Sequence, residues 1–231
     1  MSFGTVYTRD GNPRTVSIRA IAAADNLDIS YQFVQGAKEA GAEYLALNPL
    51  GKVPTLVRSD GFVLTETLAI NLYLAQQNPK TTLLGSSLEE YATIIRWMSF
   101  VNNDVYDVLG GWFLPLIGRR PYVKESVLEH IELTEKRLRM IENQLGKSRY
   151  LAGEKLTLAD LFVCGLLAAG FQCFFGREWR ESHPEFTRWS RDVYHQEIYQ
   201  MALAPEKRGK LFEIEVALPN EPFEDPTKFA R

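Results

Sequence analysis

Residues 48–56 read Asn-Pro-Leu-Gly-Lys-Val-Pro-Thr-Leu, and residues 64–67 read Leu-Thr-Glu-Thr. Proline is tolerated at the start of a strand because no hydrogen-bond donor of the ladder is lost there, and a tight turn is where a cis bond before proline is most often kept. We therefore expect the bond between Val53 and Pro54 to be cis. Such a bond would turn the Val53 N–H and C=O outward, where an extended peptide can dock on them as an added strand.

Residues 64–67 predict a helix start close to this turn. The first amides of a helix have no acceptor within the helix and lie at its positive dipole end, so a helix that begins at Glu66 and Thr67 suits a ligand carboxylate. Glu66 can accept from an ammonium group, and Lys52 supplies a countercharge for a second carboxylate. Together these residues predict a site for a short, acid-rich, zwitterionic peptide. The simpler interpretation makes Pro54 a strand terminator, Glu66 and Thr67 a helix cap and Lys52 a solvated cation, but the ordered set favours the peptide site.

Outward from these segments, the first eighty residues alternate between strand and helix periods. Strand patterns occupy residues 3–8, 28–34, 53–57 and 62–65, and helical patterns occupy residues 14–26, 38–47 and 67–77. Asp60-Gly61 is typical of a hairpin turn, so we expect the last two strands to be antiparallel. The order β-α-β-α-β-β-α predicts a thioredoxin-like α/β domain over residues 1–79, with a mixed sheet of four strands.

Beyond residue 79 the pattern becomes helical. Apolar residues recur at steps of three and four over residues 94–108 and 127–145, and residues 158–174 are apolar all round, which predicts an all-α domain over residues 88–231 after a linker at 80–87. Gly110, Gly111 and Pro115 are expected to bend or end the first helix. Thr157 and Asp160 form an acidic capping box for the central helix. Shorter helices are predicted at 187–194 and 198–203, before a surface tail at 205–231.

Composition excludes several classes of function. Lys and Arg number 26 against 29 acids, for a net charge of −3, which does not favour general binding to nucleic acid or to an anionic membrane. No apolar stretch is long enough for a membrane helix and the start is not a signal peptide, so we expect a cytoplasmic protein. Cys164 and Cys173 have neither redox nor zinc spacing and are expected to be buried. No metal site is expected, because the histidines lie in polar, surface-like segments without ligand partners: His130, His183 and His195.

These features resemble the glutathione transferase superfamily over nearly the whole chain. The resemblance rests on the β-α-β start, on LNPLGKVPTL at 47–56, on TET at 65–67, and on LAGEKLTLADLFV at 151–163, where the family's Ser/Thr-x-x-Asp capping motif falls on Thr157 and Asp160. Within the superfamily the chain is most similar to the transferase-like domain of the elongation factor one gamma subunit. The segments that carry this likeness are GTVYT, LTETLAINLYLA, IIRWMSFVNND and FFGREWRESHPEFTRW.

The resemblance implies a glutathione site, in which glutathione is a substrate and no metal takes part. By position it implies that Val53, before a cis Pro54, docks the peptide, that Glu66 and Thr67 anchor the γ-glutamyl group, and that Lys52 contacts the glycyl carboxylate. It further implies a homodimer and addition of the glutathione thiolate to an electrophilic small molecule. The second-substrate site would lie against the helices around two residues, Asn103 and Tyr106.

The residue that activates the thiol departs from the family's common patterns. Members place Tyr, Ser or Cys at the end of the first strand or the start of the first helix, whereas residues 7–14 read YTRDGNPR. Tyr7 and Thr8 point to opposite faces, so only one of them can face the site. Some fungal transferase-like proteins carry Asn in a similar loop, and we rank Asn12 first, then Thr8, with Arg14 adding positive potential. The alternative is that Asn12 only caps the helix.

Two functions therefore remain open. The first is an enzyme that conjugates glutathione to electrophiles, and the second is a non-catalytic dimerisation or scaffolding module among translation factor subunits. The lack of a Tyr, Ser or Cys favours the module, whereas the absence of the subunit's Lys-rich linker and second domain from these residues favours the enzyme, which is our expectation. Peroxidase or thiol-transferase activity is disfavoured because no Cys stands near the first helix.

Overall fold

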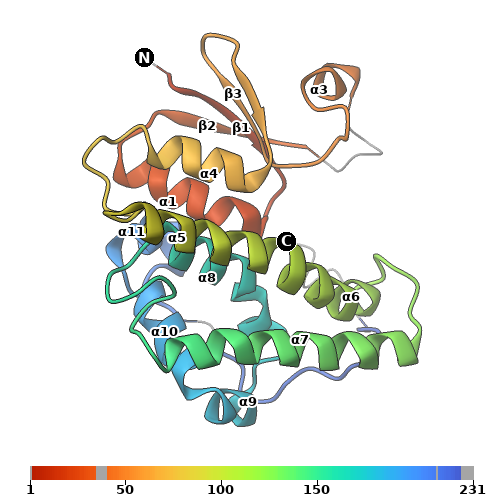
Figure 1. Ribbon diagram of the computed structural model, residues 1–231. Coiled ribbons are helices and arrows are strands. Elements are labelled where there is room, and N and C mark those ends of the chain that lie inside the picture. Colours follow the sequence, from red (N-terminus) through yellow and green to blue (C-terminus); the bar gives the residue numbers. More distant parts are fainter. Residues whose placement is uncertain (1, 35–40, 212, 225–231) are drawn as a thin grey trace.

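The computed structural model describes residues 2–34, 41–211 and 213–224. A β-sheet with its helices forms one part of the chain, and a group of helices beneath it forms the other (Figure 1). This arrangement confirms the predicted fold, a thioredoxin-like domain followed by a helical one. The first part ends with α4, at Ala75, and the second begins with α5, at Leu88.

The sheet has four strands in the order β2-β1-β3-β4. Parallel pairing joins β1 to β2, and antiparallel pairing joins β1 to β3 and β3 to β4. The strands cover shorter spans than predicted: β1 Gly4–Thr8, β2 Ile29–Phe33, β3 Thr55–Arg58 and β4 Val63–Thr65. At the β3–β4 hairpin Gly61 adopts φ +88°, which favours glycine, and the Phe62 N–H donates to Asp60 Oδ1 at 3.2 Å. The predicted antiparallel hairpin is therefore confirmed.

Three helical segments accompany the sheet. The predicted helix at 14–26 is a 3₁₀ turn, η1 Pro13–Thr15, that continues as α1 Val16–Ala24. Beside α1 lies α4 (Thr67–Ala75), and the two bury apolar side chains such as Ile18 and Ile70 beneath the sheet (Figure 1). α3 (Ala42–Leu47) stands apart from them, and the beginning of the helix predicted at 38–47 lies outside the described residues.

The first long helix of the second part bends at a different place from the one predicted. α5 (Leu88–Phe100) passes through a π-helical turn at Val101–Val105 into α6 (Tyr106–Leu116). The glycines that were expected to break the helix lie within α6, and only the end soon after Pro115 agrees with the prediction. The reason is packing: a Cβ on Gly111 would stand 1.9 Å from the ring of His130 on the neighbouring helix α7 (Lys124–Leu145).

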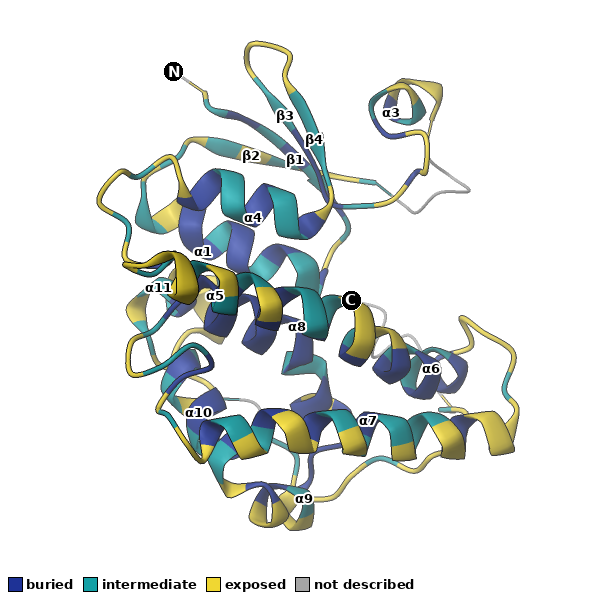
Figure 2. Ribbon diagram, viewed as in Figure 1, coloured by how far each residue is buried: buried dark blue, intermediate teal, exposed yellow. Residues whose placement is uncertain are grey.

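α8 (Leu158–Cys173) is the centre of the helical part and is buried along most of its length (Figure 2). Its capping residue Asp160 is fully buried and accepts hydrogen bonds from the Thr157 and Leu151 amides at 2.8 and 2.9 Å and from Trp189 Nε1 at 2.8 Å. Burial raises the pKa of Asp160, while these hydrogen bonds oppose the shift. The predicted capping box is therefore confirmed, and it also ties α8 to two other segments.

After α8 the described residues form shorter helices and then a segment without regular secondary structure. α10 (Pro184–Tyr194) and α11 (Glu197–Met201) lie near the predicted positions, and sequence reasoning missed α9 (Arg177–Ser182) and the 3₁₀ turn η3 (Pro205–Lys207). The predicted surface position of His183 is wrong: it is 1% exposed, because its ring stacks on Trp179 at 4.0 Å and faces Glu135 at 3.5 Å. Within the described part of the chain, no helix is long and apolar enough to cross a membrane.

Candidate active site

The loop that leads into β3 is held in place by the side chains of Tyr44 and Asn48. The sequence analysis assigned these residues only to a helix and a turn. The buried Tyr44 hydroxyl donates to the Lys52 carbonyl, and Asn48 Nδ2 donates to the same oxygen at 2.8 Å. Asn48 Nδ2 also donates to Thr55 Oγ1, at 3.1 Å. Burial raises the pKa of the Tyr44 hydroxyl, so it keeps its proton and remains a donor. Two buried donors on one carbonyl fix the backbone immediately before the proline, while the Lys52 side chain itself is exposed.

Val53 and Pro54 form the end of this loop. The bond between them is cis, as predicted. Val53 lies just outside β3, and no described residue forms a hydrogen bond with its amide or carbonyl. The adjacent Thr55 is paired with Tyr7 in the sheet, so the free backbone groups of Val53 lie beside the end of β1. An extended peptide can add to the sheet at this point through main-chain hydrogen bonds.

The start of α4 offers polar groups next to this edge. Glu66 is exposed, adopts φ +68° and ψ 117°, and occupies the N-cap position of α4, as in the simpler interpretation, but its side chain makes no capping hydrogen bond. The first intrahelical bond of this end runs from the Ile70 N–H to the Glu66 carbonyl, which leaves the preceding amides of the helix for other acceptors. Thr67 is buried and its hydroxyl donates to the Arg14 carbonyl at 3.0 Å. This bond joins the start of α4 to the turn that begins α1.

Asn12 lies in that turn and is 5% exposed. Its Oδ1 accepts from the Arg14 amide at 3.1 Å, so it does cap the first helical turn. Its Nδ2 donates to Thr8 Oγ1 at 3.2 Å, and Thr8 is fully buried. A side-chain amide has two N–H groups, so one donor of Asn12 is left after these contacts. The geometry thus makes capping and donation to a ligand compatible, and it places Thr8 behind Asn12.

Tyr106 and Asn103, the two residues predicted to line a second-substrate site, differ in their distance from the loop that begins α1. Arg14 reaches across to the helical part, where its guanidinium lies 4.3 Å from the centre of the Tyr106 ring. Tyr106 is the first residue of α6 and is half-buried. Asn103 is exposed in the π-helical turn and bonds locally, to Ser99 Oγ at 3.3 Å and to Asn102 at 3.0 Å. The structure therefore brings Tyr106, but not Asn103, into contact with a predicted catalytic-loop residue.

Two arginines that the prediction did not assign to the site lie near this contact. Burial lowers the pKa of Arg9, Tyr106 raises it, and Arg119 and Arg14 lower it, so both of these arginines are within electrostatic reach of Arg9. No described carboxylate forms an ion pair with Arg9, Arg14 or Arg119. Arg9 and Arg14 both contact Asn12 through backbone hydrogen bonds, so their charge adds positive potential beside it. The sequence spacing of Arg9, Arg14 and Arg119 does not predict that they interact, because Arg119 follows α6 in the helical part of the chain.

Comparison with known proteins identifies the family. Residues 2–76 match the family described as glutathione S-transferase, N-terminal domain, and residues 105–197 match glutathione S-transferase, C-terminal domain. The chain belongs to the glutathione S-transferase family. It is 46% identical over 194 residues to glutathione S-transferase stcT of Emericella nidulans, with 84% of this chain and 88% of that protein covered. It is 40% identical over 200 residues to glutathione S-transferase psoE of Aspergillus fumigatus, with 86% and 83% covered.

The chain is also similar to translation factors. Elongation factor 1-gamma 1 of Saccharomyces cerevisiae is 38% identical over 200 residues, and the chain spans 47% of its length. The crystal structure of the GST-like domain of elongation factor 1-gamma from that yeast superposes with a TM-score of 0.79 at 33% identity, covering 97% of this chain and 100% of that one. A glutathione transferase from Phanerochaete chrysosporium, URE2P6 with oxidized glutathione, has a TM-score of 0.80 at 21% identity, which supports the fold alone.

Both cysteines of this family member belong to α8. Both thiols are free and buried, and burial raises the pKa of Cys164 and of Cys173 to about 12. A thiol with such a pKa is almost entirely protonated at neutral pH and is a poor nucleophile. The described residues also contain no group of side chains that could hold a metal ion. The described site residues offer hydrogen-bond donors and positive charge.

Proposed function

We propose that this protein conjugates glutathione to electrophilic small molecules. One observation carries the proposal: the unpaired strand edge at Val53, the free amides of α4 and the spare donor of Asn12 meet at the end of β1, linked by the bond from Thr67 to the Arg14 carbonyl. A strand edge, an anion-binding helix start and a hydrogen-bond donor are the parts needed to hold a short peptide and to act on its thiol.

In the proposed complex, the cysteinyl backbone of glutathione pairs with Val53 beside the cis Pro54. The γ-glutamyl carboxylate lies on the amides that begin with Thr67, and the γ-glutamyl ammonium donates to Glu66. Lys52 is exposed and long enough to meet the glycyl carboxylate. The charges of the ligand and of these groups are complementary, which favours one orientation of the peptide.

The reaction requires an ionised thiol. A free thiol has a pKa near 8.5, and lowering it by roughly two units corresponds to about 3 kcal/mol of preferential stabilisation of the thiolate. A hydrogen bond to a charged group contributes about 1.5–3 kcal/mol, which the spare N–H of Asn12 can supply. The positive charge of Arg14 and Arg9 supplies the remainder. Thr8 acts by holding the other N–H of Asn12, rather than by touching sulfur.

The thiolate then adds to an electrophilic carbon, forming the C–S bond as that carbon's electron pair moves to a leaving group or an acceptor atom. The proton lost from the thiol passes to solvent. We place the electrophile against Arg14 and Tyr106, with Asn103 at its exposed margin. We also propose a homodimer acting in the cytoplasm, in line with the family resemblance.

The test combines binding and turnover. The protein is expected to bind immobilised glutathione and to conjugate 1-chloro-2,4-dinitrobenzene faster than buffer does. Asn12→Ala should lower kcat and raise the pKa of bound thiol, seen as a shifted pH profile of thiolate absorbance at 240 nm, while Thr8→Val should produce a smaller change in the same direction. No binding to glutathione, or turnover equal to buffer, would overturn the proposal.

A second function is favoured by a specific observation, the match to the whole GST-like domain of elongation factor 1-gamma. A module of this kind would dimerise or assemble with translation factor subunits without catalysis. The turnover assay distinguishes the enzyme from the module, because a module would be folded but would have no transferase activity. Such a module would also co-purify with translation factor subunits.

A further inference from the structure

The cationic side chains beside α6 outnumber the anions that the proposed reaction brings to them. Arg9 and Arg14 belong to the loop that carries Asn12, and Arg119 follows α6. Among the described residues, no carboxylate forms an ion pair with any of these three arginines. The ionised sulfur of glutathione carries one negative charge, and the glutathione carboxylates are proposed to lie on α4 and on Lys52. The three cations therefore face a single anion in the proposed complex.

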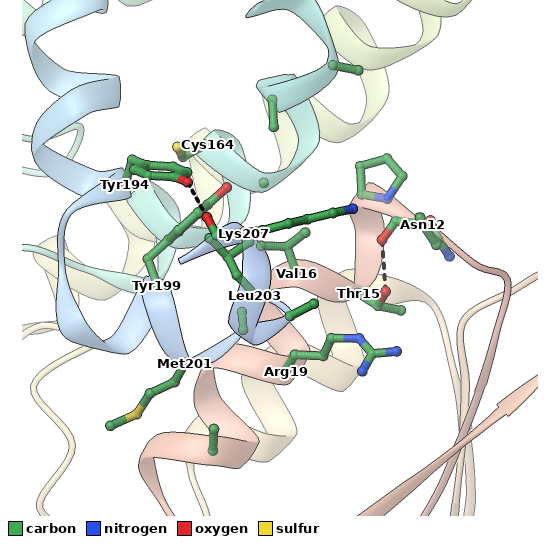
Figure 3. A pocket seen from close by; sticks show the side chains of 18 of the residues that line it. Asn12, Thr15, Val16, Arg19, Cys164, Tyr194, Tyr199, Met201, Leu203 and Lys207 are labelled. Atoms are coloured by element: carbon green, nitrogen blue, oxygen red, sulfur yellow. Dashed lines mark hydrogen bonds between the residues drawn. The ribbon is translucent and has the colours of Figure 1, made fainter. Parts of the chain in front are cut away.

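The loop that carries Arg9 and Arg14 is fixed by its own hydrogen bonds. The Asn12 N–H donates to the Arg9 carbonyl at 3.4 Å, and the Arg14 N–H donates to Asn12 Oδ1 at 3.1 Å. The Thr15 hydroxyl closes the turn by donating to the Asn12 carbonyl at 2.8 Å, which a dashed line marks in Figure 3. Both arginines therefore extend from a backbone that is held in place beside Asn12.

Arg119 is held in place by the way in which α6 ends. Gly118 adopts φ +69°, and its N–H donates to the Pro115 carbonyl at 3.2 Å. The Arg119 N–H donates to the Leu114 carbonyl at 2.9 Å, which completes the pattern of a Schellman motif. An amide of the last described segment donates to the next carbonyl, that of Leu116, at 2.8 Å. Main-chain amides thus occupy the final carbonyls of α6, and none of these carbonyls accepts a hydrogen bond from the Arg119 guanidinium.

The charge of this group reaches both ends of α6. Tyr106 is the first residue of α6, and the Arg14 guanidinium lies 4.3 Å from the centre of its ring. Burial lowers the pKa of Arg9, Tyr106 raises it and Arg119 lowers it, so Arg9 interacts with a residue at each end of the helix. The positive charge therefore extends from Tyr106, where we place the electrophile, to the residue that follows α6.

The acidic residues nearest to these arginines in the structure's own chain leave them unneutralised. Asp10 follows Arg9 directly, but its Oδ1 accepts from the Gly11 N–H at 2.9 Å. Glu221 and Glu224 belong to the segment that reaches the end of α6, and neither forms an ion pair with a described cation. Unpaired cations that are fixed on two sides of a site complement an anionic group on the ligand.

We propose that the electrophile of this enzyme carries a carboxylate, which Arg119 and Arg9 bind while Arg14 stays beside the thiolate. The inference rests on the proposed conjugation of glutathione and names the class of the second substrate. The body of the electrophile lies against Tyr106, and its acid group relieves the repulsion among the cations. With an aryl chloride, the thiolate forms the C–S bond, chloride leaves with the electron pair of the C–Cl bond, and the thiol proton passes to solvent.

The test compares 4-chloro-3,5-dinitrobenzoate with its neutral counterpart of similar shape, 4-chloro-3,5-dinitrobenzamide. For each electrophile, kcat/KM at saturating glutathione is divided by the rate constant of the uncatalysed reaction with glutathione, which removes the difference in intrinsic reactivity. The wild-type protein is expected to favour the carboxylate by about tenfold in these normalised values. Raising the ionic strength from about 0.02 M to about 0.5 M should at least halve that preference, because salt screens charges near the surface.

Two neighbouring arginines supply the variant and its matched control. Arg119→Gln should lower the preference for the carboxylate by about threefold to tenfold, because it removes one of the cations that bind it. Arg120 is also exposed but is not among the groups that shift the pKa of Arg9, so Arg120→Gln should change the preference by less than about twofold. Both electrophiles are assayed on the same sample, so a partly unfolded variant lowers both rates and leaves their ratio unchanged.

The possible failures are distinguishable. Conjugation of both electrophiles without preference for the carboxylate, or a preference that Arg119→Gln leaves as intact as Arg120→Gln does, would overturn this inference and leave the proposed conjugation standing. Failure to conjugate either electrophile would overturn the proposed function and this inference with it.

Discussion

Replacing Glu66 by glycine should make the protein more stable and, at the same time, a poorer glutathione binder. Glu66 adopts φ +68° and ψ 117°, a region that costs a residue with a side chain about 1–3 kcal/mol. Its exposed side chain makes no capping hydrogen bond that would offset this cost. Glycine relieves the strain but loses about 0.5–1 kcal/mol through the greater freedom of the unfolded chain. The net expectation for Glu66→Gly is a gain of about 0.5–2 kcal/mol in the free energy of unfolding.

The loss of affinity follows from the charge. An exposed carboxylate that becomes partly covered by the ligand ammonium is worth about 1–2 kcal/mol, so the dissociation constant for glutathione should rise about 5- to 30-fold. Glu66→Gln is the matched control, because it keeps the backbone strain and removes only the charge. It should lose a similar amount of affinity without gaining stability.

Urea unfolding followed by tryptophan fluorescence measures the stability of the three proteins, and isothermal titration calorimetry measures glutathione binding. Glu66→Gly should have a higher free energy of unfolding than Glu66→Gln, whereas the two variants should bind glutathione with similar, reduced affinity. A glycine variant that is less stable than the wild type would refute the strain argument. Undiminished glutathione affinity in both variants would refute the assignment of the carboxylate to the γ-glutamyl ammonium.

Three further outcomes are expected. Tyr44→Phe removes a buried hydroxyl from the loop before the cis proline and should lower the free energy of unfolding by about 1–2 kcal/mol, and raise the KM for glutathione more than it changes kcat. Gly111→Ala places a Cβ 1.9 Å from the His130 ring and should cost about 1–3 kcal/mol in urea unfolding, whereas Gly110→Ala, with its nearest contact at 3.7 Å, should be tolerated. Burial raises the pKa of the Cys164 and Cys173 thiols to about 12, so both should resist Ellman's reagent at pH 7.5 until urea unfolds the chain, and rapid reaction of either in the folded protein would contradict that burial.

Local sequence patterns predicted most of the fold because most helices, strands and turns are determined by residues that are close together in the chain. The hairpin at Asp60 and Gly61, the capping box of α8 and the cis bond before Pro54 depend on neighbours in the chain. The predictions are wrong where a contact with a residue far away in the sequence determines the local structure or the burial of a side chain. Gly111 does not break its helix because another helix needs the space, and His183 is buried because an aromatic stack and a carboxylate from α7 enclose it.

The candidate site divides in the same way. The segment around Val53 and the pair at Glu66 carry their chemistry in adjacent residues, so their roles can be proposed from sequence. Tyr44 differs, because its part in fixing the Lys52 carbonyl needs α3 folded beneath the loop. Sequence reasoning could rank Asn12 above Thr8, but only the structure shows that Thr8 Oγ1 accepts one N–H of the Asn12 side chain.

The charge distribution explains why Arg9 and Arg119, unlike Arg14, escaped prediction and what the arrangement of the three arginines favours. A chain with a net charge of −3 has enough carboxylates to neutralise each of its cations, yet Arg9, Arg14 and Arg119 have no described acid as partner. Burial is the main cause of the lowered pKa of Arg9, and repulsion from Arg119 and Arg14 lowers it further. A carboxylate placed among them would relieve this repulsion but would also compete with any anionic ligand. Leaving the cluster unneutralised raises the free energy of the empty site and favours the state in which a thiolate, or the charge developing on an electrophile, lies beside it.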